Sequence, residues 1–325
     1  MSDNTLRALV TCEVTNEFLI EMKSRDIQIK LDGWGQSGIV LDSEALISQA
    51  KDCEILIVEI EELNEYVLEK LPQLKFVGVS RGSPVNVDLD YCLKKNIQVV
   101  HSPGRNADSV ADYCLSMMLD LSRKLTVSSR HLGSNGWMYE GKLPYLEFRG
   151  RELGKLTVGL YGYGQIGAKV AKRLSDGFGT KVLYFDPFVE SHQHAKKVNS
   201  LDEIFEMSDI VSLHAPVIPE TENSITRSML KKLGPEGILI SSARAKLIVE
   251  EDLYRSLVSD EIAGAAIDVF WSEPIEVGDR WLQLSNVICT PHIAGASNDV
   301  VANHCKKILD GIDNWIAGKK TKELA

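Results

Sequence analysis

"TVGLYGYGQIGAKVAKRL", residues 157–174, joins an apolar run to a helical pattern through a turn that contains three glycines. Gly162 permits a tight turn, Gly164 lets a ligand approach the backbone closely, and Gly167 lets the helix pack against the strand. The start of the helix would aim free N–H groups and the positive end of its dipole at the turn. The stretch therefore predicts a strand, a phosphate-binding turn and a helix.

An acidic residue completes this pattern. Asp186 ends the next apolar run, "KVLYFD", at the distance where a carboxylate can accept a hydrogen bond from the ribose of a dinucleotide. The pyrophosphate would lie on the first turn of the helix, at Gln165 and Ile166. A 2′-phosphate would be repelled by Asp186, and no Lys or Arg follows before Lys196. The pattern favours NAD over NADP as the cofactor.

Length and composition limit the other functions. The chain has 325 residues, of which 44% are hydrophobic and 25% charged, which is typical of a soluble protein with two domains. The net charge of -10 argues against a general nucleic-acid or anionic-membrane partner. The amino terminus resembles no signal peptide, and no apolar run is long enough to cross a membrane.

The cysteines and histidines suggest no metal. Six cysteines are scattered without metal-binding spacing, and most lie in apolar runs, as expected of buried thiols in a cytoplasmic protein. His192 and His194 have a His-x-His spacing, but no Asp, Glu or Cys ligand set accompanies them. We expect no metal site and a cytoplasmic location.

Short β-branched runs alternate with amphipathic stretches along the whole chain. Strands are expected at Arg7–Thr11, Cys53–Glu59, Lys75–Ser80 and Ile97–His101, and a second series begins at residue 157. A long helical pattern from Asn106 separates the two series. This alternation predicts an α/β fold with two doubly wound domains.

Three polar residues follow strands of the second series. Arg244, Glu273 and His292 each lie just after an apolar run, and ligands of doubly wound sheets bind at the carboxyl ends of strands. Arg244 could bind a carboxylate with two parallel hydrogen bonds, and His292 could carry a proton. Singly, each of the three is more often a structural or solvated residue.

In order along the chain, these features resemble the D-isomer-specific 2-hydroxyacid dehydrogenases. The resemblance covers most of the sequence through seven stretches: "VNVD" (85–88), "SPGRNADSVADY" (102–113), "GLYGYGQIGAKVAKRL" (159–174), "SLHAPVIPETENSIT" (212–226), "LISSARAKLIVEEDL" (239–253), "AGAAIDVFWSEP" (263–274) and "TPHIAG" (290–295).

The resemblance implies a role for each chemical residue. Arg244 would bind the substrate carboxylate and polarise the C2 carbonyl, and His292 would be the acid/base. Glu273 would orient the imidazole and favour its protonated form. Family members that oxidise formate have glutamine at this position, so Glu273 argues against formate. Ala245 and Lys246 replace the glycine that usually follows the family's arginine, which affects the local backbone shape.

Further contacts also follow from the resemblance. Ala243 and Asp268 would lie at the cofactor, and Ser80, Arg81 and Gly82 would bind the substrate. Arg81 is unusual for its loop, and together with Arg105 it is either structural or marks a second anionic group, such as a phosphate or a second carboxylate. The second interpretation would point to a phosphorylated or sugar-acid substrate.

The family's architecture predicts a Rossmann NAD-binding domain, residues 105–296, inserted in a discontinuous flavodoxin-like substrate domain, residues 1–104 and 297–325. It also implies a homodimer formed through the NAD domain and a small 2-hydroxy or 2-keto acid as substrate. A rival interpretation is a non-enzymatic NAD-sensing protein, similar to the corepressors built on the same scaffold.

Overall fold

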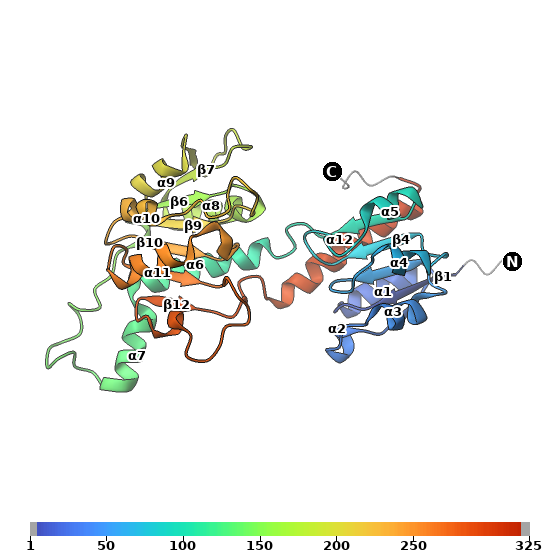
Figure 1. Ribbon diagram of the computed structural model, residues 1–325, viewed down its shortest axis with the longest axis horizontal. Coiled ribbons are helices and arrows are strands. Elements are labelled where there is room, and N and C mark those ends of the chain that lie inside the picture. The colour runs from blue at the N-terminus through green and yellow to red at the C-terminus, as the bar shows by residue number, and fades with distance from the viewer. Residues whose placement is uncertain (1–4, 320–325) are drawn as a thin grey trace. The chain divides into compact units, whose positions relative to one another are not determined.

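The computed structural model describes residues 5–319, which fold into two compact units (Figure 1). The first unit holds the residues up to Asn106 together with those from Ser297 onward, and the second holds Ala107–Ala296. The second unit is thus inserted into the first.

The first unit contains a five-stranded parallel sheet of order β2-β1-β3-β4-β5, the flavodoxin-like order. Its strands are β1 (Leu6–Val10), β2 (Ile27–Leu31), β3 (Ile55–Val58), β4 (Phe76–Val79) and β5 (Gln98–His101). Its helices are α1 (Asn16–Ser24), α2 (Trp34–Ser37), α3 (Ser43–Ala50), α4 (Glu65–Glu69), α5 (Leu89–Lys94) and α12 (Asn298–Ile316).

The second unit contains a seven-stranded parallel sheet of order β12-β11-β10-β9-β6-β7-β8, which is the Rossmann order with one added strand. Its strands are β6 (Thr157–Tyr161), β7 (Lys181–Phe185), β8 (Lys196–Lys197), β9 (Ile210–Leu213), β10 (Ile238–Ser241), β11 (Gly264–Ile267) and β12 (Val287–Cys289). Its α-helices are α6 (Ala107–Arg123), α7 (Leu125–Asn135), α8 (Gln165–Phe178), α9 (Leu201–Met207), α10 (Arg227–Leu233) and α11 (Glu250–Val258).

Each sheet is covered on both faces by helices. In the second unit, α6 and α8 pack on one face, where Val110, Met118 and Val170 are buried. Helices α9, α10 and α11 cover the other face. The strands β3 and β10 are therefore buried along their whole length, as central strands of a parallel sheet must be. The predicted doubly wound α/β class is confirmed.

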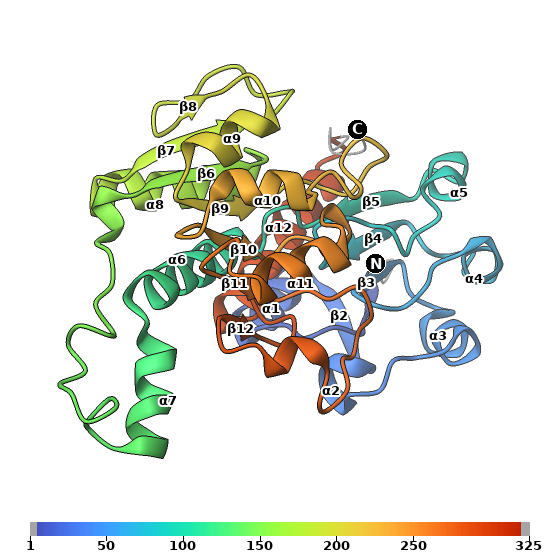
Figure 2. The ribbon, with the colours of Figure 1, turned by 60° about the vertical axis from the view of Figure 1, so that its left-hand side comes forward.

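Strands β2 and β8 and helix α7 are among the elements that the sequence-based prediction did not include. Strand β2 alternates apolar and polar residues and lies at the sheet edge, and β8 is only two residues long. Helix α7 has no buried residue, because it projects away from the rest of the second unit (Figures 1 and 2). A helix shows apolar residues at a regular spacing only where one of its faces packs on a core, so α7 lacks this pattern.

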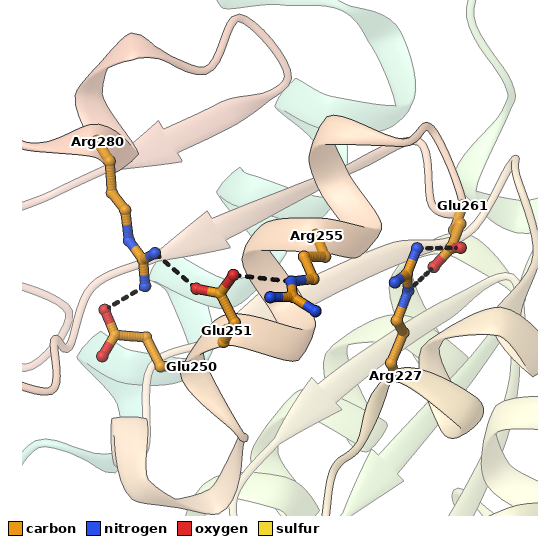
Figure 3. Close-up of polar contacts among 6 residues, drawn as sticks. All are labelled: Arg227, Glu250, Glu251, Arg255, Glu261 and Arg280. Carbon is orange, nitrogen blue, oxygen red and sulfur yellow. Dashed lines mark hydrogen bonds and ion pairs between the residues drawn. The ribbon is translucent and has the colours of Figure 1, made fainter.

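Two groups of ion pairs lie at the start of α11 and in the turn that follows it (Figure 3). Arg280 bonds Glu250 and Glu251 and stacks its guanidinium over the ring of Tyr254, 4.4 Å away. Arg227, at the start of α10, donates two parallel hydrogen bonds of 2.7 and 2.8 Å to Glu261. These pairs attach α10 and the segment after β11 to α11.

We predict that the Arg227–Glu261 pair makes stability depend on acid pH. The hydrogen bonds from Arg227 lower the pKa of Glu261 from 4.5 to about 2. A lowered pKa stabilises the folded state above the ordinary value, and this stabilisation is lost as the pH falls from about 4.5 towards 2. Glu261→Gln should therefore lower the melting temperature at pH 7, and the difference from wild type should shrink at pH 4 and pH 3.

Circular dichroism at the three pH values measures this difference. Glu236→Gln is the matched control, because Glu236 is 81% exposed and lies 3.5 Å from Arg151. A constant difference between Glu261→Gln and wild type across this pH range would contradict the prediction.

Candidate active site

Arg244, Glu273 and His292 lie beyond three neighbouring strands of one parallel sheet. Arg244 follows β10, Glu273 follows β11 and His292 follows β12. The carboxyl ends of parallel strands share one edge, so the three side chains emerge at the same edge of the second unit.

Glu273 and His292 form a direct pair. Nδ1 of His292 lies 2.8 Å from Oε2 of Glu273. A carboxylate accepts hydrogen bonds, so this contact places the proton on Nδ1 and leaves Nε2 to hold or release a second proton. Nε2 has no hydrogen-bond partner among residues 5–319, and the His292 side chain is 52% exposed.

The pKa of Glu273 is lowered on balance. Partial burial acts to raise it, but the hydrogen bond from His292, the hydrogen bond from the Phe270 N–H and the positive charge of Arg244 together outweigh burial. Oε1 of Glu273 accepts that backbone N–H at 2.8 Å. Glu273 is thus an oriented anion beside the imidazole.

The loop that carries His292 is held by Asp268. This residue is fully buried at the end of β11. Its oxygens accept hydrogen bonds from the Thr290 hydroxyl at 2.6 Å and from the Ile293 and Ala294 N–H groups at 2.8 Å each. Between these contacts, His292 has a φ of 55°, a left-handed conformation that non-glycine residues adopt only where their surroundings impose it. Asp268 therefore shapes the backbone at His292.

Arg244 is exposed at the same edge. Its Nη1 donates a 2.7 Å hydrogen bond to the Ala243 carbonyl oxygen. The segment that follows it is tied to the Glu273 turn, because Nε1 of Trp271 donates to the Ile248 carbonyl oxygen at 3.0 Å. Arg244 and the Glu273–His292 pair are thus attached to one framework.

The glycine turn has the geometry that a dinucleotide needs. Gly162 has a φ of 93°, and a Cβ atom there would lie 2.6 Å from the backbone N of Ala215. A Cβ at Gly167 would lie 2.5 Å from the Gly162 carbonyl oxygen. At Gly164, a Cβ would meet no described protein atom within 4 Å, so protein packing does not demand a glycine at that position.

The start of α8 is also suited to a phosphate. Gly164 is the N-cap and offers no side-chain hydrogen bond to the first turn. The N–H groups of this turn, which begin with Gln165 and Ile166, have no partner within the helix and can bind an anion. Only a glycine leaves the space of a side chain open beside these groups. The residues present therefore fit the pyrophosphate of NAD.

Asp186 lies beside this turn at the end of β7. Its Oδ2 accepts the Tyr163 N–H at 2.7 Å, and its Oδ1 accepts the N–H groups of Phe188 and Val189 at 2.8 and 3.2 Å. A carboxylate can accept about four hydrogen bonds, so capacity remains for a ribose hydroxyl.

The expected substrate residues of the first unit follow β4. Ser80 is fully buried, and its Oγ has no hydrogen-bond partner among the described residues. Arg81 and Gly82 are exposed, and the Arg81 side chain makes no ion pair within residues 5–319. Arg105 instead bonds Glu59 and His304 of the same unit, so a structural role is the better explanation for Arg105.

The remaining features have structural partners. Nδ1 of His192 bonds the Tyr163 hydroxyl, and His194 lies 3.3 Å from Asp176. Within residues 5–319, no group of three or more His, Cys, Asp or Glu side chains is arranged to hold a metal ion. No helix in this described part of the chain is long and apolar enough to span a bilayer.

Sequence reasoning missed two residues that the structure connects to the site. The hydroxyl of Tyr113, on α6, lies 2.7 Å from Oγ1 of Thr290, which in turn bonds Asp268. The side chain of Trp271 was missed as well. None of these contacts is local in sequence, and no pattern of spacing marks them.

Comparison with known proteins agrees with this geometry. Residues 115–294 match the family described as D-isomer specific 2-hydroxyacid dehydrogenase, NAD binding domain. The chain is 33% identical to hydroxypyruvate reductase of Thermotoga maritima, over 79% of this chain and 82% of that protein. It is 29% identical to glyoxylate reductase of Korarchaeum cryptofilum, over 97% and 93% of the two chains.

A solved structure is similar along the whole chain. The TT0316 protein of Thermus thermophilus is 27% identical, with a TM-score of 0.81, over 98% of this chain and 99% of that one. The matched family is that of an NAD-dependent enzyme, and the glycine turn of the second unit fits NAD. The chain belongs to the D-isomer-specific 2-hydroxyacid dehydrogenases.

Proposed function

We propose that the protein interconverts a D-2-hydroxy acid and its 2-keto acid, with Arg244, Glu273 and His292 as the residues that bind the substrate and move the proton. The observation that carries this proposal is the 2.8 Å contact between Nδ1 of His292 and Oε2 of Glu273. It leaves Nε2 of His292 available at the carboxyl edge of the sheet, where ligands of this fold bind.

The proton moves through His292. When bound at the glycine turn, NADH would supply the hydride that C2 of the keto acid takes up in reduction. Nε2 of protonated His292 donates its proton to the carbonyl oxygen, which becomes the hydroxyl, and the imidazole is left neutral. Glu273 keeps Nδ1 protonated and stabilises the imidazolium form before the transfer. Oxidation runs through the same groups in reverse.

Arg244 orients the substrate. Its guanidinium donors can form two parallel bonds to the carboxylate next to C2 and can also polarise the carbonyl. Its hydrogen bond to the Ala243 carbonyl oxygen uses one of five N–H groups. The others remain available to the substrate.

The second unit would hold the cofactor on Gly162, Gly164, Gly167 and the start of α8, with Asp186 on the adenosine ribose. The carboxylate of Asp186 supports a preference for NAD over NADP. Ser80, Arg81 and Gly82 remain proposed substrate residues. Ala243 and Asp268 remain proposed to lie near the nicotinamide.

The substrate class is that of short 2-keto acids. Relatives are named glyoxylate reductase and hydroxypyruvate reductase, and both of these acids carry a carboxylate next to a carbonyl. Arg81 is exposed and has no ion-pair partner among the described residues, which supports a second anionic group on the substrate. The rival function, a non-enzymatic NAD sensor, would not require the Glu273–His292 pair.

We predict that His292→Ala lowers turnover by roughly 10²–10⁴-fold and leaves the affinity for NADH unchanged, because the variant removes the proton donor and no cofactor contact. Glu273→Gln should lower turnover by about tenfold or more, since the neutral amide favours the imidazolium less. NADH oxidation, followed by its absorbance with glyoxylate, hydroxypyruvate, pyruvate and sugar-derived keto acids, measures both variants.

In the same assay, Arg81→Ala should raise KM for keto acids with a second anionic group and leave KM for pyruvate unchanged. Absence of turnover with every acid in wild type would favour the NAD-sensing function. Full activity of His292→Ala would show that another group donates the proton.

Two glycine variants separate folding from cofactor binding. Gly162→Ala should destabilise the protein by more than about 1 kcal/mol, because a positive φ and a backbone clash oppose a side chain. Gly164→Ala should leave the melting temperature without cofactor unchanged and weaken NADH binding at least about tenfold, because the methyl would occupy the phosphate site. Tight NADH binding by Gly164→Ala would exclude this cofactor position.

We also propose a homodimer through an arm that comprises α7 and residues 136–148. This arm exposes Leu132, Trp137, Tyr145 and Leu146, by 53%, 68%, 74% and 71%. Exposed apolar surface of this kind is typical of an interface.

The six free cysteines are consistent with a cytoplasmic location, which stays a prediction.

Sedimentation should give a dimer mass for wild type and a monomer mass for Leu146→Glu, since a charge would be buried at the interface. Val277→Glu, at a fully exposed site outside the arm, should remain dimeric. A monomer mass for the wild-type protein would contradict the proposed homodimer.

A further inference from the structure

A chain of hydrogen bonds connects helix α6 to the loop that carries His292. The Tyr113 hydroxyl lies 2.7 Å from Oγ1 of Thr290, and Oγ1 of Thr290 lies 2.6 Å from Oδ1 of Asp268. All three side chains belong to the second unit, and Asp268 is fully buried.

The donor and acceptor of each hydrogen bond follow from the chemistry of the three side chains. Thr290 donates its one hydroxyl proton to the Asp268 carboxylate. It can therefore only accept from Tyr113, which makes the phenol the first donor. Burial raises the pKa of Tyr113 far above its ordinary value, so this hydroxyl keeps its proton across the working pH range. Successive hydrogen bonds of one direction polarise and strengthen one another.

Asp268, the last acceptor in this series of hydrogen bonds, shapes the backbone at His292. Asp268 accepts the N–H groups of Ile293 and Ala294 while it accepts Thr290, and these contacts enclose the left-handed turn at His292. A carboxylate that loses one of its three donors can shift towards the other two. The direction in which the imidazole points would then change.

We propose that Tyr113 is a positioning residue of the active site, whose hydroxyl orders the 290–294 loop through Thr290 and Asp268 and thereby aims His292. This inference rests on the proposed role of His292 as the acid/base. Tyr113 itself touches no reacting atom in this scheme. Its effect should appear in kcat and not in the affinity for NADH.

The test uses conservative variants of the whole protein. Tyr113→Phe removes one hydroxyl, and Thr290→Val removes the central link with little change of shape. Tyr161→Phe is the matched control, because its hydroxyl also bonds a hydroxyl side chain of the second unit, Ser224 at 3.3 Å. For each variant, kcat, KM, the NADH dissociation constant and the hydrogen exchange of the Ile293 and Ala294 amides are measured.

Tyr113→Phe should lower kcat by about three- to tenfold, the fold-change expected from one hydrogen bond, with an NADH dissociation constant within about twofold of wild type. Thr290→Val should lower kcat further, and the double variant should match Thr290→Val, because both substitutions break one chain. Exchange at Ile293 and Ala294 should be faster in both variants and unchanged in Tyr161→Phe.

Three results would overturn the proposal: wild-type kcat in Tyr113→Phe, additive losses in the double variant, or an equal loss of NADH affinity, which would make Tyr113 a cofactor contact. A failure of the proposed function looks different. In that case His292→Ala would keep its turnover, whatever the exchange rates of the loop amides.

Discussion

All strands of the second unit run parallel, and this constraint decides where chemistry can occur. Parallel strands end at one edge, so the residues after β10, β11 and β12 emerge side by side although many residues separate them in sequence. The glycine turn after β6 and Asp186 after β7 lie at the same edge. The glycine turn, Arg244 and the Glu273–His292 pair therefore share one scaffold, with each part supplied by a different turn.

At that edge, the buried carboxylate of Asp268 holds the loop that carries His292. It accepts three donors from the loop after β12, so the burial of its charge is compensated by hydrogen bonds. The same contacts maintain the left-handed backbone of His292. Glu273 then restrains the imidazole from its other side. Asp268 thus fixes the backbone at His292, and Glu273 restrains its imidazole ring.

The arginines of the second unit have two different roles. Arg280 bonds carboxylates at the start of α11, and Arg227 bonds Glu261 in the turn that follows α11 (Figure 3). Arg244 has no carboxylate partner at hydrogen-bond distance among the described residues, although its charge acts on Glu273. A pair with two parallel bonds, such as Arg227–Glu261, can stabilise the fold, whereas a guanidinium without a carboxylate partner at a strand end is available to a ligand.

Much of this was predictable from the sequence alone. The glycines at 162, 164 and 167 and the run that ends in Asp186 are local patterns, because turns and strand ends have local residue requirements. Arg244, Glu273 and His292 were singled out by their positions after apolar runs and by their order along the chain, and their roles were implied by the family resemblance. The doubly wound class followed from the alternation of apolar runs and amphipathic stretches. The pairing of Glu273 with His292 was expected only through the family resemblance, and the structure shows the contact. The tertiary structure alone decided the hydrogen bonds from Tyr113 to Asp268 and the pairing of Arg105 with Glu59. These contacts join residues that are distant in the chain, and only the packing of strands and helices brings them within hydrogen-bond distance.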